Sequence, residues 1–209
     1  MRKTVLAVLA VSATLLFTSC SDFWDNMFGK ITGKATTSIN GDLEDEYCSS
    51  MAVRDKKAAV PYCVGVAVNM DIDDLIKIDN EDQIVYPVFC YRLTGTNIKS
   101  GATLTAHNTL TEEDLMNMQY TDIISGKFSD NHVVGIAESD SKFYVMSTGT
   151  IGLDKVNGVK VTGHFSGRAY VIDLNAQPML SEEQVAISGT FISRLVPMRA
   201  WIRRLQERQ

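Results

Sequence analysis

The sequence predicts a mainly β protein, an antiparallel β-sandwich or barrel with one or two short helices. Several segments alternate apolar and polar residues with a period of two, as strands with one buried face do. A pattern of aliphatic residue, hydroxyl residue, Gly, variable residue and Phe also recurs, at 124–128, 161–165 and 187–191, with a weaker copy at 31–35. An apolar content of 45% with only 4 prolines fits a chain that folds around a core.

The first residues predict export. Arg2 and Lys3 form a short positive start, and residues 4–17 are uncharged and mostly apolar. This is the layout of a secretory signal. The apolar run has about fourteen residues, fewer than the ~20 that a membrane-spanning helix needs.

A cysteine follows this run in the stretch Leu16-Phe-Thr-Ser-Cys20. The stretch resembles the lipobox of bacterial lipoproteins, and its continuation to Asp22 is similar to lipoproteins of Bacteroidota, although Phe17 departs from the usual aliphatic residue. The resemblance implies that a signal peptide, 1–19, is removed and that Cys20 carries lipid. It also implies an outer-membrane anchor, at the periplasmic face or the cell surface. The alternative is a plain secretory signal with Cys20 as a free thiol.

The remaining chain is interpreted as a lipidated Cys with a tether, 20–29, and a single β-rich domain, 30–209. Removing 19 of 209 residues leaves 190, which suits one domain. The 20 basic residues lose Arg2 and Lys3, so the remaining charge is 18 minus 25, or −7. An acidic chain is a poor candidate for binding nucleic acid, and no nucleic-acid partner is predicted.

The repeated pattern predicts curved strands that face the core. In 159–171, the residues Val161, Gly163 and Phe165 share one face, while Thr162 and His164 look outward. In the next copy Gly189 and Phe191 share the inner face, and Gly126 and Phe128 occupy the same places in the first. Gly in a strand leaves a gap, which an aromatic ring from a neighbouring strand can cover. Both the Gly and the Phe of each copy are therefore predicted core residues.

Further elements follow from the same rules. Residues 59–70 and 82–93 are apolar on both faces, which predicts central strands, and 131–137 with 142–148 predict a hairpin around the turn Glu138–Ser141. Thr111 before three acidic residues is a helix N-cap signature. A second short helix is predicted at 197–209, after Pro197.

The sequence predicts no catalytic residue, metal site or cofactor. The histidines His107, His132 and His164 are far apart in the chain, and no CxxC occurs. Ser139 to Lys142 has the letters of an SxxK motif, and Ser129 to Asn131 those of SDN, but their order is reversed and the first reads as a turn. We interpret both as chance.

Charged clusters are interpreted as solvated surface. Six acids crowd the loop 71–82, where carboxylates at that density could hold Ca²⁺, but the EF-hand pattern is not met. Arginines gather at the C-terminus, at 194, 199, 203, 204 and 208. They face lipid phosphates, the acidic loop or water, and water is the default.

The cysteines predict one disulfide, Cys48–Cys63. With a loop at Arg54–Lys57, Val53 faces Ala58 and Cys48 faces Cys63 in a simple hairpin. Directly opposed residues are close enough for the bond. Cys90 is then a buried free thiol. The alternatives are three reduced cysteines, or a Cys63–Cys90 bond.

Two hypotheses about function remain. The first is a lipid-anchored envelope protein that acts as a non-catalytic binding or structural module, with a glycan, peptide or protein partner. The second is an envelope enzyme or inhibitor whose acidic residues converge from several loops.

Overall fold

The computed structural model describes residues 33–41, 43–69, 87–117, 131–139 and 141–196. This part of the chain is mainly β, as predicted: ten strands in one hydrogen-bonded sheet, with one short helix. The elements are β1 (Lys34–Ile39), β2 (Leu43–Tyr47), β3 (Ser49–Asp55), β4 (Tyr62–Val68), β5 (Val88–Thr94), β6 (Ala102–His107), α4 (Glu112–Asn117), β7 (Val133–Ala137), β8 (Lys142–Val156), β9 (Lys160–Asp173) and β10 (Val185–Val196).

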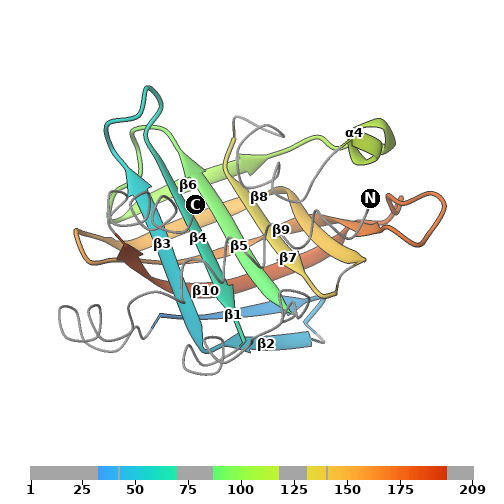
Figure 1. Ribbon diagram of the computed structural model, residues 1–209, viewed down its shortest axis with the longest axis horizontal. Coiled ribbons are helices and arrows are strands. Elements are labelled where there is room, and N and C mark those ends of the chain that lie inside the picture. The colour runs from blue at the N-terminus through green and yellow to red at the C-terminus, as the bar shows by residue number, and fades with distance from the viewer. Residues whose placement is uncertain (1–32, 42, 70–86, 118–130, 140, 197–209) are drawn as a thin grey trace, which may run out of the picture.

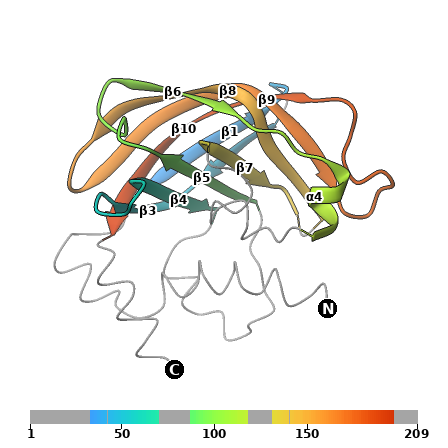
Figure 2. The ribbon, with the colours of Figure 1, turned by 90° about the horizontal axis from the view of Figure 1, so that it is seen from above.

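The strands form two layers. The long layer consists of β8, β9 and β10, extended by β6 beside β8 and by β1 and β2 beside β10. The cross layer consists of β3, β4, β5 and β7. Figure 1 shows the cross layer at a steep angle to the long layer, and Figure 2 shows the long strands arched over it. The hydrogen-bonded path runs from β8 through β9 and β10 to β3, and then through β4, β5 and β7. Because β7 pairs with β8, this path closes into a ring.

At the first corner of this ring, β10 changes its partner. It pairs with β1 as far as Ile192, and from Arg194 onward with β3, the one parallel pairing of the described sheet. Ser193 lies at the change, and its Oγ is 2.8 Å from Ser50 Oγ on β3. Both serines are fully buried. The hydroxyl pair supplies polar contact where the strand ladder is interrupted.

At the opposite corner, β8 changes from β7 to β6. It pairs with β7 as far as Val145 and with β6 from Thr148. The pairing of β8 with β9 shifts register at the same place, between Met146 and Thr148. The buried side chain of Asn108, directly after β6, donates from Nδ2 to the carbonyls of His132 (3.0 Å) and Met146 (2.9 Å). Unpaired buried carbonyls are costly. The Asn108 amide therefore stabilises the place where the two layers separate.

The core between the layers is built from the repeated pattern. On β9 and β10, Phe165 lies opposite Gly189, and Phe191 lies opposite Gly163. A Cβ at Gly189 would stand 2.7 Å from the Phe165 ring, and one at Gly163 would stand 2.8 Å from the Phe191 ring. Each ring thus fills the gap that the facing glycine leaves. The prediction that Phe165 and Phe191 are buried beside these glycines is confirmed.

Aromatic rings from both layers complete this core. Phe89 of β5 stacks on Phe165 with centroids 5.3 Å apart, and Tyr91 lies 4.5 Å from Phe191. Tyr47 of β2 reaches the same cluster. These contacts join the cross layer to the long layer, and the space between the layers is occupied by packed rings.

The cross layer is buried on its outer face as well. Val88 and Val133 face away from the aromatic core and are still buried. A second apolar cluster covers them, with leucines from before and within α4 and from the segment between β9 and β10: Leu110, Leu115, Leu174 and Leu180. The apolar, non-alternating sequence of 88–93 is explained by this double burial, as predicted for the central strand 82–93, of which 82–86 lie outside the described residues. Residues 133–137, predicted as one arm of a hairpin, are buried on both faces in the same way.

The helix begins where its capping signature predicts. The backbone N–H of Asp114 donates to Thr111 Oγ1 (3.3 Å), while Asp114 Oδ2 accepts from the backbone N–H of Thr111 (2.8 Å). This reciprocal pair is a capping box with Asp at its third helical position. The second predicted helix, 197–209, lies outside the described residues, as does the tether.

Candidate functional site

A row of hydroxyl groups crosses the outer face of the long layer. Registered pairs place one hydroxyl residue from each of five neighbouring strands directly opposite the next. We call this set the hydroxyl row; in order across β1, β10, β9, β8 and β6 it consists of Ser38, Ser188, Ser166, Thr150 and Thr105. Because neighbouring strands are ~4.8 Å apart, the row is about 19 Å long.

The hydroxyl groups of the row are available to a ligand. Ser38 is half-buried and the other four residues are exposed. Within the described part of the chain, none of the five side chains makes a hydrogen bond. Each hydroxyl can donate once and accept twice. The row therefore offers regularly spaced donors and acceptors on a surface held rigid by a continuous ladder.

A second row beside it is internally bonded. Thr36 and Thr190 are directly opposed, and their Oγ1 atoms are 2.9 Å apart. Next along is His164, whose Nδ1 is 3.3 Å from Asp154 Oδ1. Its imidazole lies over Gly152, where a Cβ would stand 2.4 Å from the ring. These contacts hold the imidazole along the face, next to the hydroxyl row.

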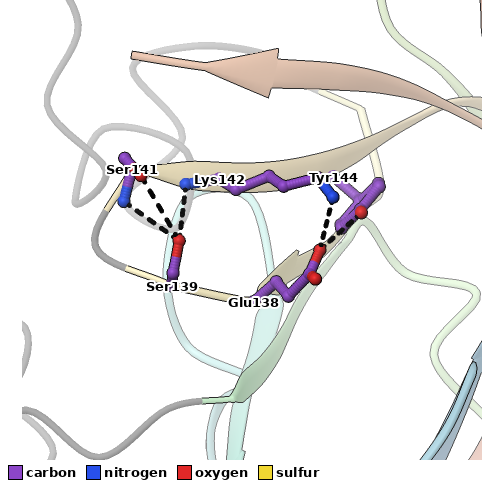
Figure 3. A network of polar contacts seen from close by, with 5 residues as sticks. All are labelled: Glu138, Ser139, Ser141, Lys142 and Tyr144. Atoms are coloured by element: carbon purple, nitrogen blue, oxygen red, sulfur yellow. Dashed lines mark hydrogen bonds and ion pairs between the residues drawn. The ribbon is translucent and has the colours of Figure 1, made fainter. Parts of the chain in front are cut away.

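The β7–β8 turn carries a network of charged and polar groups (Figure 3). Glu138 Oε2 accepts a hydrogen bond from the Tyr144 hydroxyl (2.6 Å) and lies 3.0 Å from Lys142 Nζ. The Tyr144 hydrogen bond is the main cause that lowers the pKa of Glu138, and hydrogen bonding to Tyr144 first and to Glu138 second raises the pKa of Lys142. Burial and the Glu138 charge raise the pKa of Asp45. Strand β2, which carries Asp45, therefore lies within electrostatic reach of Glu138. The bonds join β7 to the start of β8.

The SxxK letters in this turn form no serine–lysine pair. Ser139 Oγ accepts from the backbone N–H groups of Lys142 (3.1 Å) and Ser141 (3.4 Å), so the hydroxyl caps the turn. The ammonium of Lys142 instead contacts Glu138. These contacts agree with the interpretation of the motif as a chance match.

The predicted Cys48–Cys63 disulfide is wrong, and none of the three described cysteines is in a disulfide. Strand β3 extends to Asp55, whose Oδ1 accepts from the backbone N–H of Lys57 (2.7 Å) and of Ala58 (3.1 Å). This turn starts the loop later than predicted, so Cys63 pairs with Arg54. Cys48 precedes β3 and is exposed, whereas Cys63 is buried in the core.

The alternative bond between Cys63 and Cys90 is also not formed. Cys63 lies opposite Leu93, while Cys90 lies opposite Val66, so the two thiols point to opposite faces of the cross layer. Cys90 is buried, as predicted, and is not in a disulfide. Burial raises the pKa of Cys63 to about 12. The Cys63 thiol is therefore protonated at neutral pH and packs as a small apolar side chain.

The three histidines lie on different elements: His107 ends β6, His132 precedes β7, and His164 is on β9. His132 Nδ1 accepts from the backbone N–H of Thr94 (3.1 Å), and burial and Arg92 lower its pKa. Among the described residues, no three or more His, Cys, Asp or Glu side chains gather as metal ligands would.

Several residues singled out in the sequence lie outside the described ranges. They are Cys20, the motif pair Gly126 and Phe128, the acidic loop 71–82 and the C-terminal arginines after Arg194. The hydroxyl row, by contrast, is a site that the sequence pattern did not single out. Its signal is present, because the predicted outward positions of 159–171 and 183–196 are rich in Ser and Thr, but only pairing aligns them.

No protein-family model, curated protein or solved structure matches the chain. In the part of the chain that the structure describes, none of the helices has the length and apolarity needed to cross a membrane.

Proposed function

We propose that this chain is a lipid-anchored envelope protein that binds a ligand on the outer face of its long layer. The observation that carries the binding role is the hydroxyl row, with its unpaired hydroxyl groups on five adjacent strands. The anchor rests on the sequence, in which a charged start and an apolar run lead to Leu16–Cys20. The ligand is a glycan, a peptide or a protein surface with matching hydrogen-bonding groups.

The packing supports an external site. Phe89, Phe165 and Phe191 fill the space between the layers with ring contacts. Ligand contacts are thus expected outside the ring of strands. A single copy of a site that binds through hydroxyl groups alone has a weak affinity, because each hydroxyl gives up hydrogen bonds with water when it bonds to the ligand. Many copies anchored in one membrane raise the effective affinity for a large or repeated ligand.

The anchor is tested by Cys20→Ala in cells supplied with labelled fatty acid. We expect the wild-type protein to carry the label and sediment with the outer membrane. The variant is expected to be unlabelled and soluble. A variant that remains tightly membrane-bound would contradict the anchor.

The binding role is tested with the full chain in a detergent that has no sugar head group. The variant Ser166→Ala/Ser188→Ala/Thr150→Val removes three hydroxyls of the row, and Thr162→Val is the matched control, since its opposed residues Ile192 and Lys155 lie outside the row. Isolated envelope fractions are passed over each protein. Retention by wild type and control, with loss in the triple variant, is expected. Equal retention by all three would show that the row is not the site.

A further inference from the structure

The strand β6 is an open edge of the long layer. Of the described strands, only β8 pairs with it, over six uninterrupted positions from Ala102 to His107. Its side chains alternate between buried Ala and Leu and exposed Thr and His. An edge strand presents backbone N–H and C=O groups that a further strand can pair with.

The hydrogen-bond phase of β6 identifies which backbone groups are open. Asn108 continues the register opposite Ser147, and its N–H donates to the Ser147 carbonyl (2.7 Å). Because bonding alternates along an antiparallel pair, the even-numbered residues face β8, and Thr103, Thr105 and His107 face the open edge. The His107 carbonyl already accepts from Asn131 Nδ2 (2.7 Å). The backbone groups of Thr103 and Thr105 remain for a partner strand.

This edge lacks the features that prevent sheets from joining. It has no Lys, Arg, Asp, Glu or Pro and no bulge in its pairing with β8. The other end of the sheet, β2, contains Glu44, Asp45 and Glu46 among its five residues. Two copies meeting at β2 would place acid beside acid, whereas two copies meeting at β6 would meet without charge repulsion.

We propose that β6 pairs antiparallel with β6 of a second copy of this chain, which joins two long layers into one sheet. Residues that face each other must share side-chain direction and bonding phase. With Thr103 opposite Thr105 of the second copy, both conditions hold, and each copy uses all four open backbone groups of these two residues. The symmetric contact places Leu104 opposite Leu104 on the buried face, as a two-fold interface requires.

The proposal is independent of the proposed ligand and anchor, although Thr105, where the hydroxyl row ends, would lie opposite Thr103 of the second copy. In this register five residues of β6, 102–106, pair in each copy and extend about 17 Å, which is short for a standard interface. The association is therefore expected to depend on concentration, and to be favoured where copies share a membrane.

Cysteine cross-linking tests the register. In the full chain with Cys48→Ser, a protein with Thr103→Cys is mixed with one carrying Thr105→Cys and exposed to mild oxidant. Opposed Cα atoms ~5 Å apart permit a disulfide, so the mixture is expected to form a linked dimer. We expect no linked dimer from either variant alone or from the Cys48→Ser background. A dimer from Thr105→Cys alone in equal yield would overturn the pairing.

Disrupting the edge gives a second test that does not depend on cross-linking. Thr105→Pro removes an N–H that faces the open edge, and Pro is tolerated there; Thr105→Lys places a charge at the same position. Thr150→Lys, directly opposite on β8, is the matched control on the same face. Sedimentation should show about tenfold less dimer for either Thr105 variant and no change for Thr150→Lys. The proposal would be overturned if the wild-type chain stayed monomeric in detergent and in vesicles. It would also be overturned if Thr150→Lys reduced the amount of dimer as much as the Thr105 variants do.

Discussion

The two layers differ in what lies on their outer faces. In the long layer, the residue after buried Phe165 is Ser166, which is exposed, and the same alternation continues through β6 and β9. In the cross layer, neighbouring Val133 and Val134 are both buried, because the aromatic core lies on one side and the leucine cluster on the other. Away from the start of β8, where Phe143 and Val145 join the second apolar cluster, the long layer thus has one buried face and one exposed face, while the cross layer is packed on both.

The largest expected effect is at the inner face of the long layer. Phe165→Ala removes a ring that packs on Phe89 and fills the space over Gly189, so we expect a loss of ~3–5 kcal/mol in unfolding free energy. The adjacent Ser166→Ala should change it by less than ~0.5 kcal/mol. Denaturant unfolding of both variants measures this contrast, and an equal loss at the two positions would contradict the one-faced description.

In the cross layer, the same comparison of neighbours should give no contrast. Val133→Ala and Val134→Ala each delete buried methyl groups, and each is expected to cost ~2 kcal/mol, from ~0.8 kcal/mol per group and the cavity that remains. Denaturant midpoints at constant slope are the measurement. If Val133→Ala were neutral, the outer face of this layer would not be structural.

At the corner where the layers separate, Asn108→Ala leaves the carbonyls of His132 and Met146 without their shared donor. Buried unpaired groups predict a loss of ~1–3 kcal/mol. Asn131→Ala is the matched control, because Asn131 is exposed and its Nδ2 donates to the carbonyl of the exposed His107. Thermal unfolding should separate the two; a larger shift for Asn131→Ala would mean that the corner is held elsewhere.

The smallest effect is a pH dependence at the β7–β8 turn. The Tyr144 hydroxyl lowers the pKa of Glu138. The stability that this hydrogen bond contributes is therefore complete above the ordinary carboxyl pKa, and it is lost as the pH falls through the lowered pKa of the folded protein. Tyr144→Phe should be less stable than wild type at pH 7 by under ~1 kcal/mol, since Glu138 is partly exposed. The difference should shrink as the pH falls below about 4. A difference that grows on acidification would contradict the assignment.

The cysteine register shows where prediction from sequence reached its limit. The residues around Cys48 and Cys63 do form a hairpin of strands, as the pattern predicts. The turn is longer than predicted because the Asp55 carboxylate bonds two backbone N–H groups beyond it. Similarly, the elements predicted from the sequence do not include β6, where Ala, Thr and His give a weak alternation. Pairing with β8 supplies what local preference lacks.

The sequence by itself determined the side-chain direction along β9 and β10, the partnership of Phe and Gly in the core, and the capped start of α4, because each depends on residues close together in the chain. Tertiary structure decided the closure of the ring at Ser193 and Ser147, the burial of both faces of the cross layer, the alignment of the hydroxyl row and the open edge at β6. These features depend on which distant strands pair and in which register. A shift of one residue would reverse every face, and that choice is made by packing across the whole sheet.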